Sequence, residues 1–292
     1  MFAPPCENLR ILRCAREFRF GVSAWTTILN NAEFDADSCL SDKPWGSVWR
    51  ITADLPTGPT PLIIKVHAAR TPRDRIRSNL HLTRLRRQWR GSARLSRAGF
   101  PAARCQALIT GFREGRRIDA LVMDALPGRT LLDVLAEGDL PLAQERLLAK
   151  SLGRLLNGLW YAGLHSKDLK PSNLLVSNEH EHPNLTILDT DAVGHRPAHP
   201  LLPLVIEPSG LGVLPRRSAL FRVAREWAWN AWLAGPDRFA PGEERPGRKM
   251  ESRIARRAWR EVADLVRQHG DATPTHDPIR GGAPLAQPAS CG

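Results

Sequence analysis

The amino-acid sequence predicts an α+β fold with a β-rich first lobe and a helical second lobe. Short runs of apolar and β-branched residues, bounded by turn residues, recur up to Asp124 and are interrupted by one long basic stretch with helical spacing. After Leu126 the apolar residues mostly follow helical spacing. This change of character places the expected lobe boundary near Leu126.

The first lobe is expected to begin with a β-hairpin. Its strands are 47–53 and 61–67, and the turn between them is Pro56-Thr57-Gly58-Pro59. Two more strands are expected at 105–111 and 117–124. The first lobe therefore contains at least four strands.

One helix is expected between these two pairs of strands, from Thr71 to Ala98. Thr71 before Pro72 suits an N-cap followed by the first helical position, and Gly99 suits the position after the C-terminus. The predicted apolar stripe of this helix consists of Leu82, Leu85, Trp89 and Ala93.

The second lobe is expected to open with helices at 130–136 and 142–162. The longer helix carries one apolar face, formed by Leu148, Leu152, Leu155 and Leu159. After Gly194 the sequence predicts a Pro-rich irregular stretch to Pro215, and then two amphipathic helices. Their apolar positions are Leu220, Val223, Trp227 and Ala231, and Ile254, Ala258, Val262 and Leu265.

Four segments follow from these patterns. They are an N-terminal extension (1–40), the first lobe (41–125), the second lobe (126–269) and a tail (270–292). The tail is rich in Gly, Pro, Ala and Thr, so it cannot bury enough apolar surface to offset its ordering entropy, and we expect it to be disordered.

Charge and cysteine content narrow the class of protein. The chain has 292 residues and a net charge of +12, and 36 of its 42 basic residues are arginine, a bias that a GC-rich genome also produces. Charge alone therefore does not predict nucleic-acid binding. The arginines between Arg70 and Arg97 are interpreted as a solvated helix face, with a surface for an anionic ligand as the alternative.

The five cysteines are scattered and never form a C-x-x-C pair, which predicts neither a disulfide framework nor a zinc site and favours a reducing cytoplasm. The N-terminus lacks the apolar core of a signal peptide, and the longest apolar stretch, near Leu201 to Ile206, is too short to span a bilayer. We expect a protein that is not integral to a membrane.

The segment from Leu164 to Val176 carries the strongest chemical pattern. It contains Asp168, Lys170 and Asn173 in the D-L-K-x-x-N order of a kinase catalytic loop, after a long helix and before an apolar strand. In that loop the aspartate accepts the proton of the attacking hydroxyl, the lysine meets the transferred phosphate, and the asparagine holds Mg²⁺.

A second strand, ending at Leu188, leads directly into Asp189, which is 21 residues after Asp168. A carboxylate here completes the predicted metal site. Asp191 either shares this site or is its main ligand in place of Asp189; the sequence leaves both readings open.

Lys65 lies at the centre of an apolar strand, where an unpaired ammonium group is costly to bury. The phosphates of a nucleotide would be a suitable partner. Upstream, Gly46-Ser47-Val48 matches only the end of a glycine-rich loop, because Ser41 and Lys43 stand where the first two glycines would be.

Three further segments carry a family resemblance. They are the basic helix Thr83 to Trp89 followed by Arg97-Ala98-Gly99-Phe100-Pro101, the hinge-like segment Leu121 to Gly128, and Asp189-Thr190-Asp191 in place of D-F-G. With the catalytic loop, they make the chain resemble the kinase-like superfamily. Within it, the chain is most similar to the bacterial lipopolysaccharide kinases that phosphorylate Kdo or heptose sugars of the lipid A core.

The resemblance spans about residues 40 to 235. It implies a two-lobed protein-kinase-like fold with ATP and Mg²⁺ as cofactors. The implied catalytic residues are Asp168 and Lys170; the implied nucleotide-binding residues are Gly46, Val48, Lys65, Met123, Ala125, Asn173 and Asp189; the implied metal ligands are Asn173, Asp189 and Asp191. The implied partner is a sugar or glycolipid acceptor, at a cytoplasmic location with peripheral contact to an anionic membrane surface, and nucleic acid is not expected.

The sequence also departs from this pattern. No Asp or Glu occurs between Asp74 and Glu114, and Gln88 stands where an acidic partner of Lys65 is expected. A glutamine can bond to an ammonium group, but charge-assisted hydrogen bonds are roughly twice as strong as neutral ones. A pseudokinase that acts as a binding module is therefore an alternative.

The catalytic loop departs too, because His165 stands one position before the histidine of an H-R-D motif, whose place Ser166 takes. No A-P-E motif follows, and Ile206-Glu207-Pro208 is a poor substitute for it. This departure counts against a second alternative, a protein Ser/Thr kinase, which the sequence of the loop itself favours.

Overall fold

The chain forms two compact units in a computed structural model. The first consists of residues 1–126 with 189–192, and the second of residues 127–188 with 193–292. The structure describes residues 7–15, 25–28, 38–43, 46–55, 58–80, 82–113, 115–137, 140–177, 183–195, 201–211, 219–220, 222–224, 256–257, 260, 262–270, 276–277 and 283–284. Each unit is described separately.

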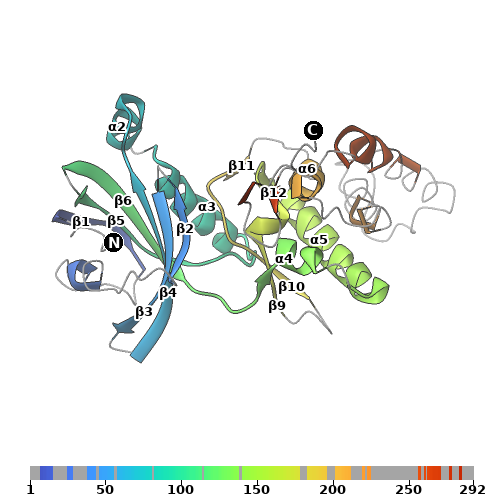
Figure 1. Cartoon of the computed structure of the whole chain (residues 1–292), viewed down its shortest axis with the longest axis horizontal. Coiled ribbons are helices and arrows are strands. Elements are labelled where there is room, and N and C mark those ends of the chain that lie inside the picture. The colour runs from blue at the N-terminus through green and yellow to red at the C-terminus, as the bar shows by residue number, and fades with distance from the viewer. Residues whose placement is uncertain are drawn as a thin grey trace, which may run out of the picture. The chain divides into compact units, whose positions relative to one another are not determined.

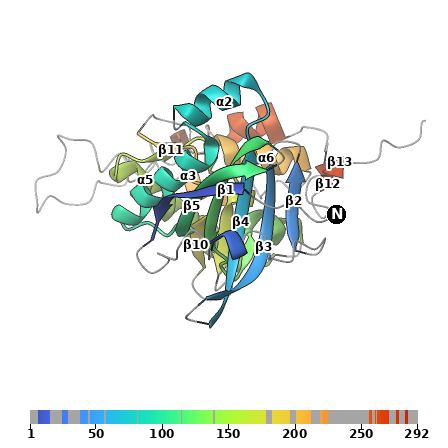
Figure 2. The ribbon, with the colours of Figure 1, turned by 90° about the vertical axis from the view of Figure 1, so that its left-hand side faces the viewer.

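The first unit contains a six-stranded antiparallel sheet in the order β1-β5-β6-β4-β3-β2 (Figure 1). The strands are β1 (Glu7–Cys14), β2 (Cys39–Lys43), β3 (Gly46–Leu55), β4 (Gly58–Ala68), β5 (Cys105–Arg113) and β6 (Arg116–Asp124). The four predicted strands are confirmed as β3 to β6, and β3 and β4 form the predicted hairpin. β1 and the first two residues of β2 come from the predicted N-terminal extension, and β1 extends the sheet beside β5 (Figure 2).

The two faces of this sheet differ in character. Leu62 and Ile64 of β4 are fully buried on one face, in an apolar cluster that includes Trp25 and Ile109. Because side chains alternate along a strand, Lys65 points to the opposite face. Helix α3 lies on that face and contacts β5 and β6.

The single helix predicted from Thr71 to Ala98 is wrong, because the structure has two helices, α2 (Pro72–Asn79) and α3 (Arg84–Arg97). Thr83 interrupts the helix with an extended backbone (ψ 158°), and its hydroxyl donates to Asp119 Oδ2 at 2.6 Å. That tertiary hydrogen bond replaces the continuation of the helix. The predicted ends are confirmed, since Thr71 caps α2 and Gly99 has φ +78° after α3.

The apolar stripe predicted for α3 is only partly correct. Leu85 is buried, but Leu82 is 45% exposed. The buried face instead includes Gln88, Ser92 and Leu95. Polar residues occur on this face because the sheet presents polar partners to it, among them Lys65.

The second unit is built around α5 (Leu142–Tyr161), whose predicted face of four leucines is buried. A three-stranded sheet has the order β10-β9-β7, and β11 pairs with β8. The other elements of this part are β7 (Arg129–Thr130), α4 (Leu131–Ala136), β8 (His165–Ser166), η2 (Pro171–Asn173), β9 (Leu174–Ser177), β10 (Asn184–Ile187) and β11 (Val193–Gly194).

The prediction of an irregular stretch between Gly194 and Pro215 is wrong, because α6 (Leu202–Leu211) lies there. Pro203 is tolerated in the first turn, where backbone N–H groups have no helical partner. Leu204, Val205 and Pro208 are buried, so packing of this apolar face offsets the hydrogen bond that Pro208 cannot make.

The remaining predictions fall largely outside the described residues. Leu220, Val223, Val262 and Leu265 are buried as predicted, whereas Trp227, Ala231, Ile254 and Ala258 lie outside the described residues. The last described elements are η3 (Val266–Gly270), β12 (His276–Asp277) and β13 (Ala283–Pro284), and β12 pairs with β13. The rest of the predicted tail is not described.

No helix among the described residues is long and apolar enough to cross a membrane.

Candidate functional site

Lys65 is the central cation of the candidate site in the first unit. It lies in the middle of β4, opposite Val48 of β3 and Leu121 of β6. Its Nζ donates to Gln88 Oε1 of α3 at 3.2 Å. Burial lowers the pKa of Lys65, and the negative charge of Asp189 opposes that shift.

Gln88 is 1% exposed and uses both ends of its side chain. While Oε1 accepts from Lys65, Nε2 donates to Met123 Sδ at 3.3 Å. The expected position of Gln88 beside Lys65 is therefore observed. A neutral amide, rather than a carboxylate, orients the ammonium group.

The segment Asp189–Ala192 belongs to the first unit, where it lies directly against α3. Thr190 Oγ1 donates to the carbonyl of Gln88 at 2.7 Å. A Cβ at Gly91 would be 1.9 Å from the carbonyl oxygen of Thr190. Only glycine fits at position 91, which explains a residue that otherwise weakens a helix interior by about 1 kcal/mol.

Arg84 joins the two acidic residues of this segment. Its Nη2 is 2.6 Å from Asp189 Oδ2, and its Nε is 3.0 Å from Asp191 Oδ2. Arg87 adds a second contact, with Nη2 3.3 Å from Asp191 Oδ2. Two carboxylates thus share one positive group.

The charges around Asp189 keep it ionised. Burial alone would raise the pKa of this carboxyl group, but the positive charges of Lys65 and Arg84 outweigh burial, and the pKa lies below its ordinary value. Asp189 and Asp191, which both contact Arg84, supply the carboxylate oxygens that Mg²⁺ prefers as ligands. Asp189 and Asp191 therefore fit the metal-binding role predicted for them.

The end of the predicted glycine-rich loop is the start of β3. Gly46 pairs with Lys43 of β2 and with His67 of β4. A Cβ at Gly46 would be 2.4 Å from the carbonyl oxygen of Val66, so the close approach of β4 requires glycine. Val48 lies two residues further, directly opposite Lys65.

The predicted adenine-binding segment is the end of β6. Met123 is buried between Ile63 and Cys105 of the neighbouring strands. The N–H groups of Asp124 and Ala125 donate to the carbonyls of Arg104 and Pro61 at 3.1 and 3.2 Å. These two amides are therefore already bonded within the protein.

Asp168 and Asn173 meet in the second unit, as a catalytic loop requires. Asn173 Nδ2 donates to the Asp168 carbonyl at 2.9 Å and to its carboxylate oxygen Oδ2 at 3.1 Å. The backbone N–H of Asp168 donates to Ser166 Oγ at 3.3 Å. Ser166 thus orients the loop from the position where an H-R-D motif has histidine.

Lys170 and Ser172 are tied to α6 by Glu207. Lys170 Nζ lies 3.7 Å from Asp168 Oδ1 and 3.5 Å from Glu207 Oε1. The backbone N–H of Ser172 donates to Glu207 Oε2 at 2.9 Å, and its hydroxyl donates to Oε1 at 2.5 Å. Glu207 therefore fixes the loop, although Ile206-Glu207-Pro208 is a poor match to A-P-E.

His165, beside the loop, packs as an aromatic group. Its ring makes an edge-to-face contact with Trp160 at a centroid distance of 5.1 Å. Burial and the neighbouring His195 lower the pKa of His165. This histidine keeps a packing role although it stands one position early.

Sequence reasoning missed the contacts of Arg84, Arg87 and Gly91, and it dismissed Glu207 as part of a poor match to A-P-E. Gly91 gave a signal, because a glycine inside a helix often marks close packing. The two arginines gave none, since they are two of many on a basic helix.

Comparison with known proteins adds one match. The model of the lipopolysaccharide kinase (Kdo/WaaP) family matches residues 61–199. This range contains Lys65, Gln88, Met123, the loop from Asp168 to Asn173, and Asp189 with Asp191. No significant match to a curated protein was found.

A match to a kinase family supports phosphotransferase activity, and kinases of this kind use ATP and usually a divalent metal. The recognition made from the motifs is confirmed: residues 61–199 match the lipopolysaccharide kinase (Kdo/WaaP) family.

Proposed function

We propose that the protein is an ATP-dependent kinase that transfers a phosphoryl group to a hydroxyl of a lipopolysaccharide core sugar, Kdo or heptose. One observation carries the proposal: the family match over residues 61–199 contains the buried Lys65, the loop of Asp168, and the acidic pair Asp189 and Asp191. We further propose a two-lobed protein-kinase-like fold, in which the first unit supplies nucleotide-binding residues and the second supplies the base.

In this proposal Asp168 accepts the proton of the acceptor hydroxyl. Asn173 supports this role, because its amide donates to the Asp168 carboxylate at 3.1 Å and limits the orientations of that group. Lys170, 3.7 Å from the same carboxylate, places a positive charge where the transferred phosphoryl group gains negative charge.

Asp189, Asp191 and Asn173 would hold Mg²⁺, and Lys65 would contact the phosphates of ATP. When bound, the metal neutralises charge on the phosphates. Arg84 would compete with the metal for Asp189 and Asp191, since one carboxylate oxygen of each faces its guanidinium group. Gln88 keeps Lys65 oriented in either case.

The location proposed for this reaction is the cytoplasmic face of a membrane. A net charge of +12 supports contact with an anionic surface, since each basic group near such a surface adds about 1 kcal/mol.

Nucleotide binding is tested by thermal shift with ATP and Mg²⁺. We expect a rise in melting temperature that needs both, because a ligand that binds only the folded state stabilises it. Asp189→Asn should abolish the rise, whereas Asp54→Asn, an exposed carboxylate of β3, should retain it. No rise at millimolar ATP would contradict the nucleotide site.

The acceptor is tested by offering Kdo and heptose glycolipids and generic Ser/Thr peptides with labelled ATP. Labelling of a glycolipid is expected. Labelling of peptides alone would overturn the sugar acceptor in favour of a protein Ser/Thr kinase.

A pseudokinase is the second candidate, and Gln88 is the observation that favours it. With a neutral partner for Lys65, nucleotide binding without turnover on any acceptor would support this alternative.

A further inference from the structure

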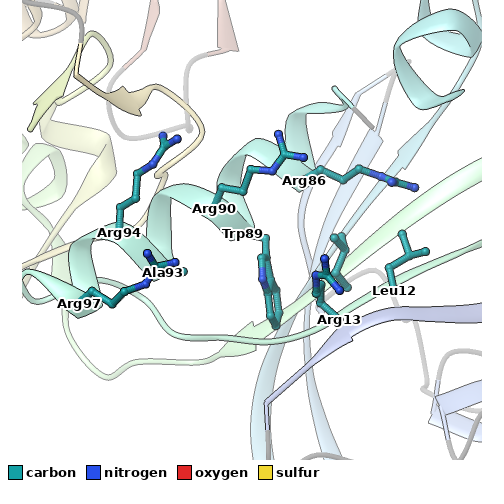
Figure 3. Close-up of a pocket in the computed structure, with 9 residues that line it drawn as sticks. Leu12, Arg13, Arg86, Trp89, Arg90, Ala93, Arg94 and Arg97 are labelled. Carbon is teal, nitrogen blue, oxygen red and sulfur yellow. The ribbon is translucent and has the colours of Figure 1, made fainter. Parts of the chain in front are cut away.

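The first unit contains a cavity on a side of α3 away from Lys65. It is a cavity of about 580 Å³ between α3 and strands β1 and β5 (Figure 3). Its lining includes Arg13 of β1, and Arg86, Trp89, Arg90, Arg94 and Arg97 of α3. We call this cavity the arginine pocket. None of the predicted catalytic, nucleotide-binding or metal-binding residues lines it, but four of its arginines belong to the basic helix face for which the sequence left an anionic ligand as an alternative.

Five guanidinium groups around one cavity give it a strong positive charge. Arg86 pairs with the buried Asp119, with Nε 3.4 Å from Oδ2. Among the residues that the structure describes, none of Arg13, Arg90 and Arg97 forms an ion pair. Like charges repel at close range, so an anion would relieve this arrangement.

The arginines of α3 have a regular spacing. Arg86, Arg90, Arg94 and Arg97 follow one another at intervals of three or four residues, which places them along one side of the helix. With a rise of 1.5 Å per residue, the series extends over roughly 16 Å. A ligand that engages several of them needs more than one anionic group.

Trp89 gives the pocket an aromatic surface. Figure 3 shows its indole reaching from α3 toward Arg13, with Arg90 and Arg97 on the same helix. The side chain is partly exposed, so a ligand can contact its ring. The pocket thus combines charge with a flat apolar surface.

We propose that the arginine pocket is a binding site for a ligand that carries two or more phosphate groups. Phosphate fits best because the guanidinium group donates two parallel hydrogen bonds to it. The ligand is either a soluble phosphate compound or the headgroup of an anionic lipid, and both present the same chemistry. The proposal does not depend on the proposed kinase activity. Gln88 and Arg84 contact Lys65 and Asp189, and none of these residues lines the arginine pocket.

Calorimetric titration tests this proposal with inorganic pyrophosphate and with phosphatidylcholine vesicles that contain phosphatidic acid. EDTA in all samples removes Mg²⁺-dependent binding. The pocket variant is Arg90→Ala with Arg97→Ala, whose side chains are exposed and whose removal should leave the fold intact. The matched control is Arg50→Ala with Arg116→Ala, two exposed arginines of the same sheet that lose the same charge.

We expect the pocket variant to bind about tenfold more weakly or worse, while the control variant binds like wild type. If pyrophosphate binds in this way, the ligand is a soluble phosphate compound. If only the vesicles do, the ligand is a lipid headgroup. Equal weakening in the pocket and control variants would overturn the proposal, as would no binding of either probe by wild type.

A second variant, Arg90→Lys with Arg97→Lys, keeps the charge and removes the two-pronged donor. Affinity below that of wild type supports phosphate recognition by the guanidinium groups. Affinity equal to wild type would show that charge alone attracts the probe and would overturn the site as a specific one.

Discussion

The loop around Asp168 and the charged cluster around Lys65 are assembled in opposite ways. Asn173 reaches Asp168 across five residues of chain. In the cluster, 23 residues separate Lys65 from Gln88, and 105 separate Arg84 from Asp189. The loop is a local structure that one further residue, Glu207, fastens to α6. The cluster exists only because β4, α3 and the segment after β10 meet.

The two regions also differ in charge balance. In the cluster, Lys65, Arg84 and Arg87 face two carboxylates, Asp189 and Asp191. A glutamate at position 88 would equalise positive and negative charges, but Gln88 leaves one positive charge in excess. In the loop, by contrast, the carboxylate of Asp168 lies beside one lysine, Lys170, at 3.7 Å.

Removing the carboxylate of the loop should have the largest effect. Asp168→Asn should lower the turnover number by about 10² to 10⁴-fold, the usual contribution of a general base. Binding of ATP with Mg²⁺ should change little, since the substitution keeps Asp189 and Asp191, and Asn173 keeps its hydrogen bond to the backbone carbonyl of residue 168. Steady-state kinetics and thermal shift on the same variant separate the two effects. Full activity would exclude Asp168 as the base.

Restoring charge balance in the cluster should have a smaller effect of opposite sign. Gln88→Glu should raise kcat/KM by roughly fivefold, because a charge-assisted hydrogen bond to Lys65 is about 1 kcal/mol stronger than a neutral one. The carboxylate cannot donate to Met123 as the amide does, so Gln88→Met serves as the control that loses both contacts. An unchanged or lower rate with Glu would show that Lys65 is oriented by other groups.

Removing the contacts of Arg84 with Asp189 and Asp191 should have a modest effect on metal binding. Arg84→Ala should lower by about two- to fivefold the Mg²⁺ concentration that half-saturates ATP binding, since Arg84 competes for both carboxylates. The factor is small because the Arg84 side chain is 44% exposed. Arg77→Ala, on the exposed side of α2, is the charge control. A higher Mg²⁺ requirement in Arg84→Ala would mean that Arg84 holds the carboxylates in place for the metal.

The contrast between loop and cluster explains what the sequence could predict. Strands β3 to β6 of the sheet, α4 and α5 follow from local periodicity and turn residues, and so does the loop, whose functional groups lie within six residues, whereas β1 and β2 were not predicted. Lys65 was predictable because a lysine in an apolar strand is costly unless it has a partner.

The contacts of Arg84 and Arg87 with the two aspartates were not predictable, because no local property distinguishes these two arginines from the others of the helix. The break before α3 was missed for the same reason: it depends on a hydrogen bond from Thr83 to Asp119, 36 residues away. α6 was missed because its prolines argue against a helix locally, while burial of Leu204 and Val205 favours it.

The smallest predicted effect is on stability. It concerns the helix caps of α2 and α4, which are built alike in the two units. Thr71 and Asp74 form a capping box at α2, and Thr130 and Asp133 form the same box at α4. The hydrogen bonds from Thr71 lower the pKa of Asp74. Its contribution to stability is therefore fully present above about pH 3.9 and is lost as the pH falls through the lowered value.

Asp74→Asn should lower the free energy of unfolding by about 0.3 to 1.5 kcal/mol at pH 7, and the difference from wild type should shrink as the pH falls below about 3.9 and through the lowered pKa of the wild-type carboxyl group. Asp133→Asn is the matched variant in the second unit. Urea denaturation followed by circular dichroism measures both. If the two units unfold in separate steps, each variant shifts only the transition of its own unit; if both variants shift one common transition, the loop and the cluster share a single folding event although they are assembled so differently.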